Sequence, residues 1–251
     1  MSKLGFCFLI KGAVEHLPLW EQFFQSSTPG SVGIYVHAKT ASPTSVLTGS
    51  WIDQSPLETA WGDLSLVMAT HRLFSQAVAD GCDSMVLLSG DMLPLQSMAW
   101  IRSFCARTRL SLQPRFGLSQ RQLDANHVRF ASIAPHLGLP IDRLRKQNMF
   151  FVITKDDFEV VSQSAVIDQF PLCRLADEYF WVNHLIRLQI SWQESRVVYC
   201  NPDPTCTQAL DLFLNLPLLK RCRDAGYAFM RKVSSLDWEA LDALNSVYAH
   251  K

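Results

Sequence analysis

The N-terminal part of the chain alternates between short apolar runs and longer segments of helical periodicity. Residues 5–10, 31–36 and 85–88 are mainly apolar, which is typical of strands buried on both faces of a sheet. Between them, residues 15–25 and 60–80 carry apolar side chains at steps of three and four, which predicts two helices. Strands and helices in this alternation indicate an α/β fold with a mostly parallel sheet and helices on both of its faces.

The pattern becomes weaker along the rest of the chain. Residues 150–153 form another apolar run, and a helix is predicted over 177–188 with Asp177 as its N-cap. Residues 110–140 are predicted to be a loop, either a solvated insertion or a flap that binds an acceptor. Ser234 is expected to cap a closing helix.

No internal repeat, low-complexity tract or clear linker divides the 251 residues. A chain of this length forms one large domain or two small ones, and one α/β domain is the simpler expectation. We therefore predict a single domain over residues 1–251. Its nucleotide-binding half is expected at 1–108 and its acceptor-binding and catalytic half at 109–251.

Composition and charge narrow the classes of partner. Hydrophobic residues make up 48% of the chain and charged residues 18%, so a sizeable core can form and wholesale disorder is excluded. The 23 Lys and Arg residues balance the 23 Asp and Glu residues. This balance gives no bulk-charge attraction to nucleic acid or to an anionic membrane, so we expect no nucleic-acid partner.

The cysteines and the apolar runs bear on the compartment. There are 7 cysteines and no C-x-x-C motif, which argues against a complete disulfide framework and predicts buried, reduced thiols. No run approaches the roughly 18 apolar residues of a membrane span, and the N-terminus lacks the features of a signal peptide. We expect no integral membrane segment, and a soluble, cytoplasmic protein.

Several ligand-binding motifs are missing from the sequence. There is no G-x-G-x-x-G and no P-loop, so neither a Rossmann dinucleotide site nor a P-loop site is supported. There is also no Asp-x-Asp, a short acidic pair that could hold Mg²⁺ or Mn²⁺ against a diphosphate. We predict no metal site, and expect side-chain cations to contact any phosphate-bearing ligand.

Polar residues follow two of the predicted strands directly. His37 ends the second strand, and Ser89, Gly90 and Asp91 follow the third. Ligands of such sheets bind beyond the carboxyl ends of the strands. His37 is therefore expected either to contact a nucleotide base or ribose, or to hydrogen-bond a neighbouring loop. Gly90 lets backbone approach a ligand closely, and Asp91 either binds a sugar or ribose hydroxyl or forms a structural turn.

Five segments, in the same order, resemble the core-2/I-branching β-1,6-N-acetylglucosaminyltransferases and the peptide-O-xylosyltransferases. Each segment alone is a weak match, and the shared order carries the resemblance. The most specific are an Asp-Glu-Tyr helix start and an Arg-Lys ending. The segments are Ile34-Tyr-Val-His-Ala-Lys39, Val86-Leu-Leu-Ser-Gly-Asp-Met-Leu-Pro-Leu95, Lys146-Gln-Asn-Met-Phe-Phe-Val-Ile-Thr-Lys155, Ala176-Asp-Glu-Tyr-Phe-Trp181 and Tyr227-Ala-Phe-Met-Arg-Lys-Val233.

The resemblance implies a GT-A-like glycosyltransferase that moves GlcNAc or xylose from a UDP-sugar to a glycan or other hydroxyl acceptor. The transfer would invert the anomeric carbon and require no metal, with the UDP-sugar as co-substrate and no further cofactor. Glu178 matches the family's catalytic base, and Lys232 matches its diphosphate-binding lysine. Arg231 is adjacent, and neighbours in a strand point to opposite faces. We therefore expect one of the two cations at the phosphate, and favour Lys232.

Two other functions remain open from the sequence. One is a catalytically silent relative that binds a glycan or a partner protein. In that case Glu178 serves only the helix dipole, and Arg231 and Lys232 form a solvated surface pair. The other is a nucleotidyl- or phosphotransferase on a similar sheet, which would normally need an acidic metal-binding cluster. Activity that persists in EDTA would count against the second function.

Overall fold

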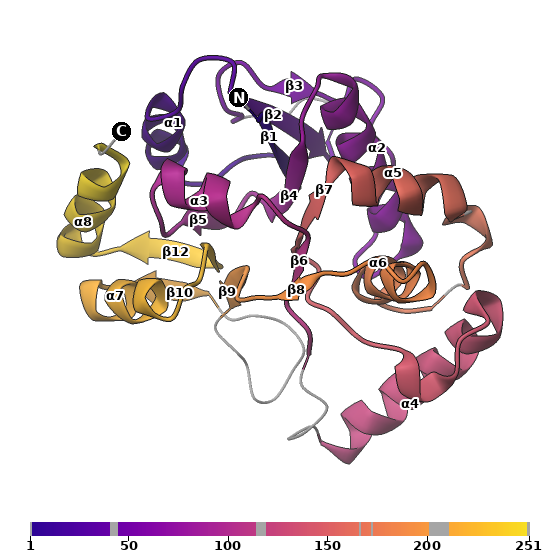
Figure 1. Ribbon diagram of the computed structural model, residues 1–251. Helices are drawn as coiled ribbons and strands as arrows, with labels where there is room; N and C mark the ends of the chain where they lie inside the picture. The colour runs from indigo at the N-terminus through magenta and orange to yellow at the C-terminus, as the bar shows by residue number, and fades with distance from the viewer. Residues whose placement is uncertain are drawn as a thin grey trace.

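A mostly parallel sheet of seven strands forms the centre of the molecule (Figure 1). The structure is a computed structural model and describes residues 2–40, 45–113, 119–165, 167–171, 173–200 and 211–249. The sheet order is β3-β2-β1-β4-β7-β6-β8; β7 alone runs antiparallel to both of its neighbours. The strands are β1 (Leu4–Ile10), β2 (Val32–Ala38), β3 (Trp51–Ile52), β4 (Ser84–Ser89), β6 (Arg109–Leu110), β7 (Val152–Thr154) and β8 (Gln193–Glu194).

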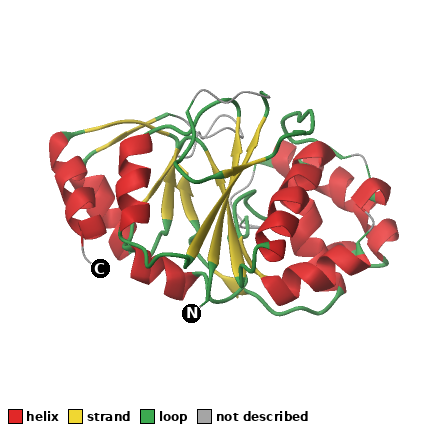
Figure 2. Ribbon diagram, turned by 90° about the horizontal axis from the view of Figure 1, so that it is seen from above, coloured by secondary structure: helices red, strands yellow, loops and turns green. Residues whose placement is uncertain are grey.

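Helices lie on both sides of this sheet, as Figure 2 shows. Helices α1 and α8 pack together on one side, whereas α2 contacts β1, β2 and β4 and packs against α5 and α6 on the other. The predicted α/β architecture is confirmed. The helices are α1 (Leu17–Gln25), α2 (Leu64–Ala79), α3 (Met98–Phe104), α4 (Gln120–Leu137), α5 (Lys155–Ser164), α6 (Ala176–Arg187), α7 (Leu216–Asp224) and α8 (Trp238–Ala249), with 3₁₀ turns at Ile141–Arg143 and Ile167–Gln169.

Strand β1 shows why the apolar runs have no polar face. Every residue of β1 is buried. The Phe6 ring packs edge-on against rings of α1, with Phe24 at 4.9 Å between centroids. Gly5 faces the other way, because a Cβ there would lie 3.2 Å from the Cβ of Ala77 in α2. A strand covered by helices on both faces needs apolar side chains at successive positions.

Two small sheets bring the C-terminal part of the chain beside the exit of β4. In one sheet, β11 (Phe229–Arg231) lies between β5 (Met92–Pro94) and β9 (Val198–Cys200). In this register Arg231 pairs with Met92 and with Cys200. In the other, β10 (Leu212–Leu214) runs parallel to β12 (Val233–Leu236). The ends of β4, β9 and β11 therefore meet, although they are far apart in sequence.

The prediction of a loop over 110–140 is wrong, because helix α4 occupies much of this segment. Ser119 and Gln122 form a reciprocal capping box at the start of α4, which stabilises a helix locally. The buried side chains of α4 gather near its C-terminal end, so no apolar stripe runs along the whole helix. They are Ile133, Ala134 and Leu137.

Both predicted helix caps are also wrong. Leu175 precedes α6 in the left-handed region at φ 69°, and Asp177 is the second residue of the helix rather than its cap. Helix α8 begins after Asp237, whose Oδ1 accepts the N–H of Ala240 at 2.7 Å. Ser234 lies in β12, and its hydroxyl donates to the Leu212 carbonyl of the neighbouring strand β10 at 3.1 Å. The pairing of β12 with β10 holds Ser234 in a strand, so α8 begins only at Trp238. The local sequence does not reveal this pairing.

The described residues show neither a membrane-spanning helix nor a disulfide bond. Within the described ranges, no helix combines the length and the apolar character that crossing a bilayer requires. The described cysteines are free thiols; four of them are buried and Cys173 and Cys200 are half-buried. Cys206 lies outside the described residues.

Candidate functional site

An ion pair ties the exit of β4 to the end of β11. Arg231 Nε donates to Asp91 Oδ1 at 3.0 Å and to Oδ2 at 3.2 Å. The Ser89 hydroxyl also donates to Asp91 Oδ1, and the Asp91 carbonyl accepts the N–H of Val233 at 3.2 Å. Asp91 therefore holds Arg231 in one orientation, and this carboxylate is already engaged by protein groups.

The outer part of the Arg231 guanidinium is open to a ligand. Its Cζ lies 4.9 Å from the centroid of the Phe150 ring, and its side chain is 26% exposed. Neither Nη atom donates a hydrogen bond to the described part of the chain. A guanidinium fixed through Nε still presents terminal N–H groups that match the oxygens of a carboxylate or phosphate.

Glu178 lies in the first turn of α6, beside a buried lysine. The Nζ of Lys146 is 2.8 Å from Glu178 Oε2, and the two side chains are 8% and 20% exposed. Oε2 accepts no aligned hydrogen bond from the described residues, so the contact is one of charge. The N–H of Gln147 donates to the Glu178 carbonyl at 2.9 Å, which fixes this segment to the helix. The ammonium of Lys146 and the positive end of the helix dipole both attract the Glu178 carboxylate.

Cys200 at the end of β9 connects these two groups. The amide Nδ2 of Asn148 lies 4.0 Å from its Sγ. Burial raises the pKa of the Cys200 thiol, the positive charge of Arg231 opposes this, and the charge of Glu178 adds to it. Cys200 also pairs with Arg231 in the small sheet, and the segment that carries Asn148 contacts Glu178 through Lys146 and Gln147. Arg231 and Glu178 therefore belong to one site. We call Asp91, Lys146, Asn148, Glu178, Cys200 and Arg231 the strand-end cluster.

Lys232 directly follows Arg231, between β11 and β12. Its carbonyl accepts the N–H of Leu212 at 2.8 Å. Its half-buried side chain forms no ion pair or hydrogen bond with the residues that the structure describes. A phosphate-binding role for Lys232 stays a prediction. Of the two cations, Arg231 is the one whose side-chain contacts place it in the strand-end cluster.

His37 is enclosed by protein at the end of β2. It is 1% exposed, and its Nε2 accepts the N–H of Leu57 at 3.0 Å. Burial lowers the pKa of the imidazole, and the nearby charge of Asp53 opposes this shift. The contacts are those of a histidine that positions the loop after β3. A contact between His37 and a nucleotide stays a prediction.

Gly90 is required by a close approach of two backbone segments. A Cβ at this position would lie 2.3 Å from the carbonyl oxygen of Ala13. The Gly90 carbonyl in turn accepts the N–H of Glu15 at 2.7 Å. The backbone that comes close to Gly90 is thus that of the segment after β1, and an approach by a ligand stays a prediction.

The Gly90→Ala variant should therefore lose stability even without ligand. Overpacking of this kind costs roughly 1–3 kcal/mol, and urea unfolding followed by circular dichroism would measure the loss. Gly12→Ala is the matched control, because among the described residues a Cβ there meets the Thr40 hydroxyl alone, at 3.4 Å. Equal stability of both variants and the wild type would remove the packing explanation.

Asp177 is a second carboxylate at the start of α6, and its burial could not be predicted from the residues around it. It is 7% exposed, and its Oδ1 has no hydrogen-bond partner among the described groups. Burial raises the pKa of this carboxyl to about 7, and the adjacent charge of Glu178 contributes. Asp177 is consequently the residue of this site whose charge depends most strongly on pH near neutrality.

Sequence reasoning placed Glu178, Asp91, Ser89 and Arg231 near the site but did not assign roles to other members of the cluster. Lys146 and Asn148 lie in a segment quoted only for its family resemblance, and Cys200 was read as one of several buried thiols. The available signal for Lys146 was its place at the start of the segment that resembles the family. No pattern in the sequence indicated Cys200. Within the described ranges, no three or more His, Cys, Asp or Glu side chains gather as metal ligands would.

The chain is similar to one protein family and to several solved structures. The profile of the Core-2/I-Branching enzyme family matches residues 4–167. A crystal structure of the galactosyltransferase LgtC with donor and acceptor sugar analogs is similar at 11% identity and a TM-score of 0.39, covering 96% of this chain and 95% of that one. An active-site mutant of LgtC is similar at 11% identity and a TM-score of 0.38, with coverages of 96% and 94%. No curated protein sequence matches the chain.

Proposed function

Because the chain belongs to the Core-2/I-Branching enzyme family, a glycosyltransferase family, we propose that the strand-end cluster is its transfer site. The proposed reaction moves GlcNAc or xylose from a UDP-sugar to a hydroxyl of a glycan or other acceptor, inverts the anomeric carbon and needs no metal. One observation carries the proposal: the segment 146–150 contacts Glu178, the candidate base, through Lys146, and contacts Arg231, the candidate phosphate ligand, through Phe150.

Glu178 has the chemistry that the acceptor side requires. In an inverting transfer the acceptor oxygen forms a bond to C1 of the sugar while the bond from C1 to the UDP oxygen breaks. The acceptor proton must leave as this happens, and a carboxylate in reach can accept it. Oε2 of Glu178 is buried and lies 2.8 Å from Lys146 Nζ, while the side chain as a whole is 20% exposed, which leaves part of the carboxylate accessible. In this proposal the lysine holds the carboxylate in its orientation.

Arg231 has the chemistry that the donor side requires. The departing UDP gains negative charge, and fixed cations can stabilise that charge without a metal. The terminal N–H groups of Arg231 are open, while Asp91 holds its Nε. Lys232 adds a second cation next to it. The lack of Asp-x-Asp in the sequence supports a metal-independent donor site.

Substitution of Arg231 by alanine should weaken UDP binding by about 10- to 100-fold, because charge-assisted hydrogen bonds contribute roughly 1.5–3 kcal/mol. Lys232→Ala should also weaken it. Titration calorimetry with UDP measures both, and Lys220→Ala, an exposed cation on α7, is the control. Unchanged affinity in both variants would move the donor site away from β11.

A screen of UDP-sugars against sugar acceptors, with and without EDTA, tests the function itself. The expected result is UDP release from UDP-GlcNAc or UDP-xylose that EDTA does not reduce. Activity that EDTA removes and Mg²⁺ restores would contradict the metal-independent mechanism. UDP binding without turnover of any donor would instead support a catalytically silent, glycan-binding relative.

A further inference from the structure

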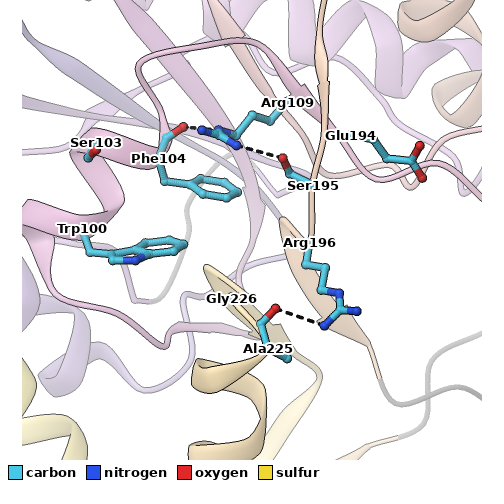
Figure 3. A pocket seen from close by; sticks show the side chains of 9 residues that line it. All are labelled: Trp100, Ser103, Phe104, Arg109, Glu194, Ser195, Arg196, Ala225 and Gly226. Carbon is cyan, nitrogen blue, oxygen red and sulfur yellow. Dashed lines mark hydrogen bonds between the residues drawn. The ribbon is translucent and has the colours of Figure 1, made fainter.

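A second candidate binding site lies in an open pocket of about 470 Å³ between α3, β6, β8 and the turn after α7 (Figure 3). It is separate from the strand-end cluster. Arg196 lines the pocket ahead of β9, whereas Cys200 ends that strand. Four extended residues span about 13 Å. Gly226 likewise precedes β11, and Arg231 ends it. The pocket and the cluster therefore lie at opposite ends of the same two strands.

Aromatic rings form one wall of this pocket. Trp100 and Phe104 are stacked, with centroids 4.9 Å apart and planes at 17°. Phe104 is buried and Trp100 is half-buried, so Trp100 offers the accessible face. The hydroxyl of Ser103 makes no hydrogen bond to the described chain. An indole face beside a free hydroxyl suits the apolar face and the ring hydroxyls of a sugar.

Two arginines in the pocket are fixed but not neutralised. Arg109 donates to the Phe104 carbonyl and, through Nη1, to the Ser195 hydroxyl at 2.9 Å. Arg196 Nη1 donates to the Ala225 carbonyl at 3.1 Å. Neither forms an ion pair within the described residues, and Figure 3 shows the carboxylate of Glu194 turned away from Arg109. Guanidinium groups held by neutral oxygens keep their charge for an external anion.

From these contacts we propose that the pocket binds an acidic glycan, through a sugar that carries a carboxylate. The sugar ring would stack on Trp100, and its carboxylate would meet the open N–H groups of Arg196 and Arg109. A nucleotide base suits the pocket less well, because the wall that completes it is formed by Ala225 and Gly226 rather than a second aromatic ring. The site would hold an acidic chain away from the reacting group. Its existence does not depend on catalysis at Glu178.

Indole NMR of the full-length protein tests the proposal with defined probes. The ligands are a hexuronate oligosaccharide, a sialylated trisaccharide, a neutral oligosaccharide and UDP, and Trp100→Phe assigns the Trp100 signal. An acidic probe should shift this signal, and the neutral chain should bind at least tenfold more weakly. The two acidic probes distinguish a uronate from a sialate. Equal response to acidic and neutral chains, no response to either acidic probe, or a response to UDP alone would overturn the proposal.

Variants separate the pocket from the transfer site. Arg196→Gln should remove the preference for the acidic probe, and it disturbs the fold less than a change at the more buried Arg109. Arg187→Gln, an exposed arginine on α6, is the matched control and should bind like the wild type. The Glu178→Gln variant should bind the acidic probe normally, so the pocket can be supported even if transfer at Glu178 is not. An unchanged preference in Arg196→Gln would contradict the proposed contact.

Discussion

Replacement of Glu178 by glutamine is expected to lower the rate of sugar transfer by about 10²- to 10⁴-fold, the usual contribution of a general base. Glutamine keeps the size of the side chain but cannot accept the acceptor proton. UDP should still bind, because the proposed donor contacts come from Arg231 and Lys232. Steady-state assays of UDP release, combined with calorimetry of UDP binding, measure both effects on one preparation.

Glu159→Gln is the control for this experiment, since Glu159 is a 42% exposed carboxylate that contacts Lys155 at 3.9 Å on α5. The Glu178 variant also leaves the buried ammonium of Lys146 without its carboxylate, which lowers stability. Its rate is therefore compared at a temperature where circular dichroism shows both proteins folded. A folded Glu178→Gln protein with near wild-type transfer would show that the base lies elsewhere.

Replacement of Asp177 by asparagine is expected to remove a pH dependence of stability. Burial raises the pKa of Asp177 from 3.8 to about 7, so the folded protein binds this proton more tightly than the unfolded chain. The folded wild type therefore has this contribution in full below about pH 4, and it loses stability as the pH rises towards 7. A difference of one pKa unit between the folded and unfolded states is worth about 1.4 kcal/mol. The free energy of unfolding therefore falls by on the order of a few kcal/mol over this window.

Urea unfolding of the wild type and Asp177→Asn at pH 4, 5.5 and 8 measures this effect. The two proteins should be similar at pH 4, and the variant should be the more stable one at pH 8. Asp168→Asn changes an exposed carboxylate and should give no such divergence. A constant difference between wild type and Asp177→Asn at all three pH values would show that Asp177 is ionised throughout.

The strands of the central sheet were predictable because their environment leaves a local mark. All residues of β1 are buried, so its composition alone shows that both faces are covered. Helix α4 left a weaker mark, because its buried side chains gather near one end and the Ser119–Gln122 capping box is its main local signal. A helix of this kind is stabilised by specific hydrogen bonds more than by a continuous apolar face.

The sequence by itself determined the α/β class and the order of the elements. Through motifs that agree with the family match, it also determined the class of enzyme. Only the tertiary structure decided which side chains act together. Arg231 and Asp91 are separated by 140 positions, yet Nε of Arg231 is 3.0 Å from Oδ1 of Asp91. Strand β7 and helix α5 lie between Lys146 and Glu178 in the sequence, yet Nζ of Lys146 is 2.8 Å from Oε2 of Glu178. The physical reason is that hydrophobic periodicity reports local burial, whereas charge pairing depends on how strand ends meet in space.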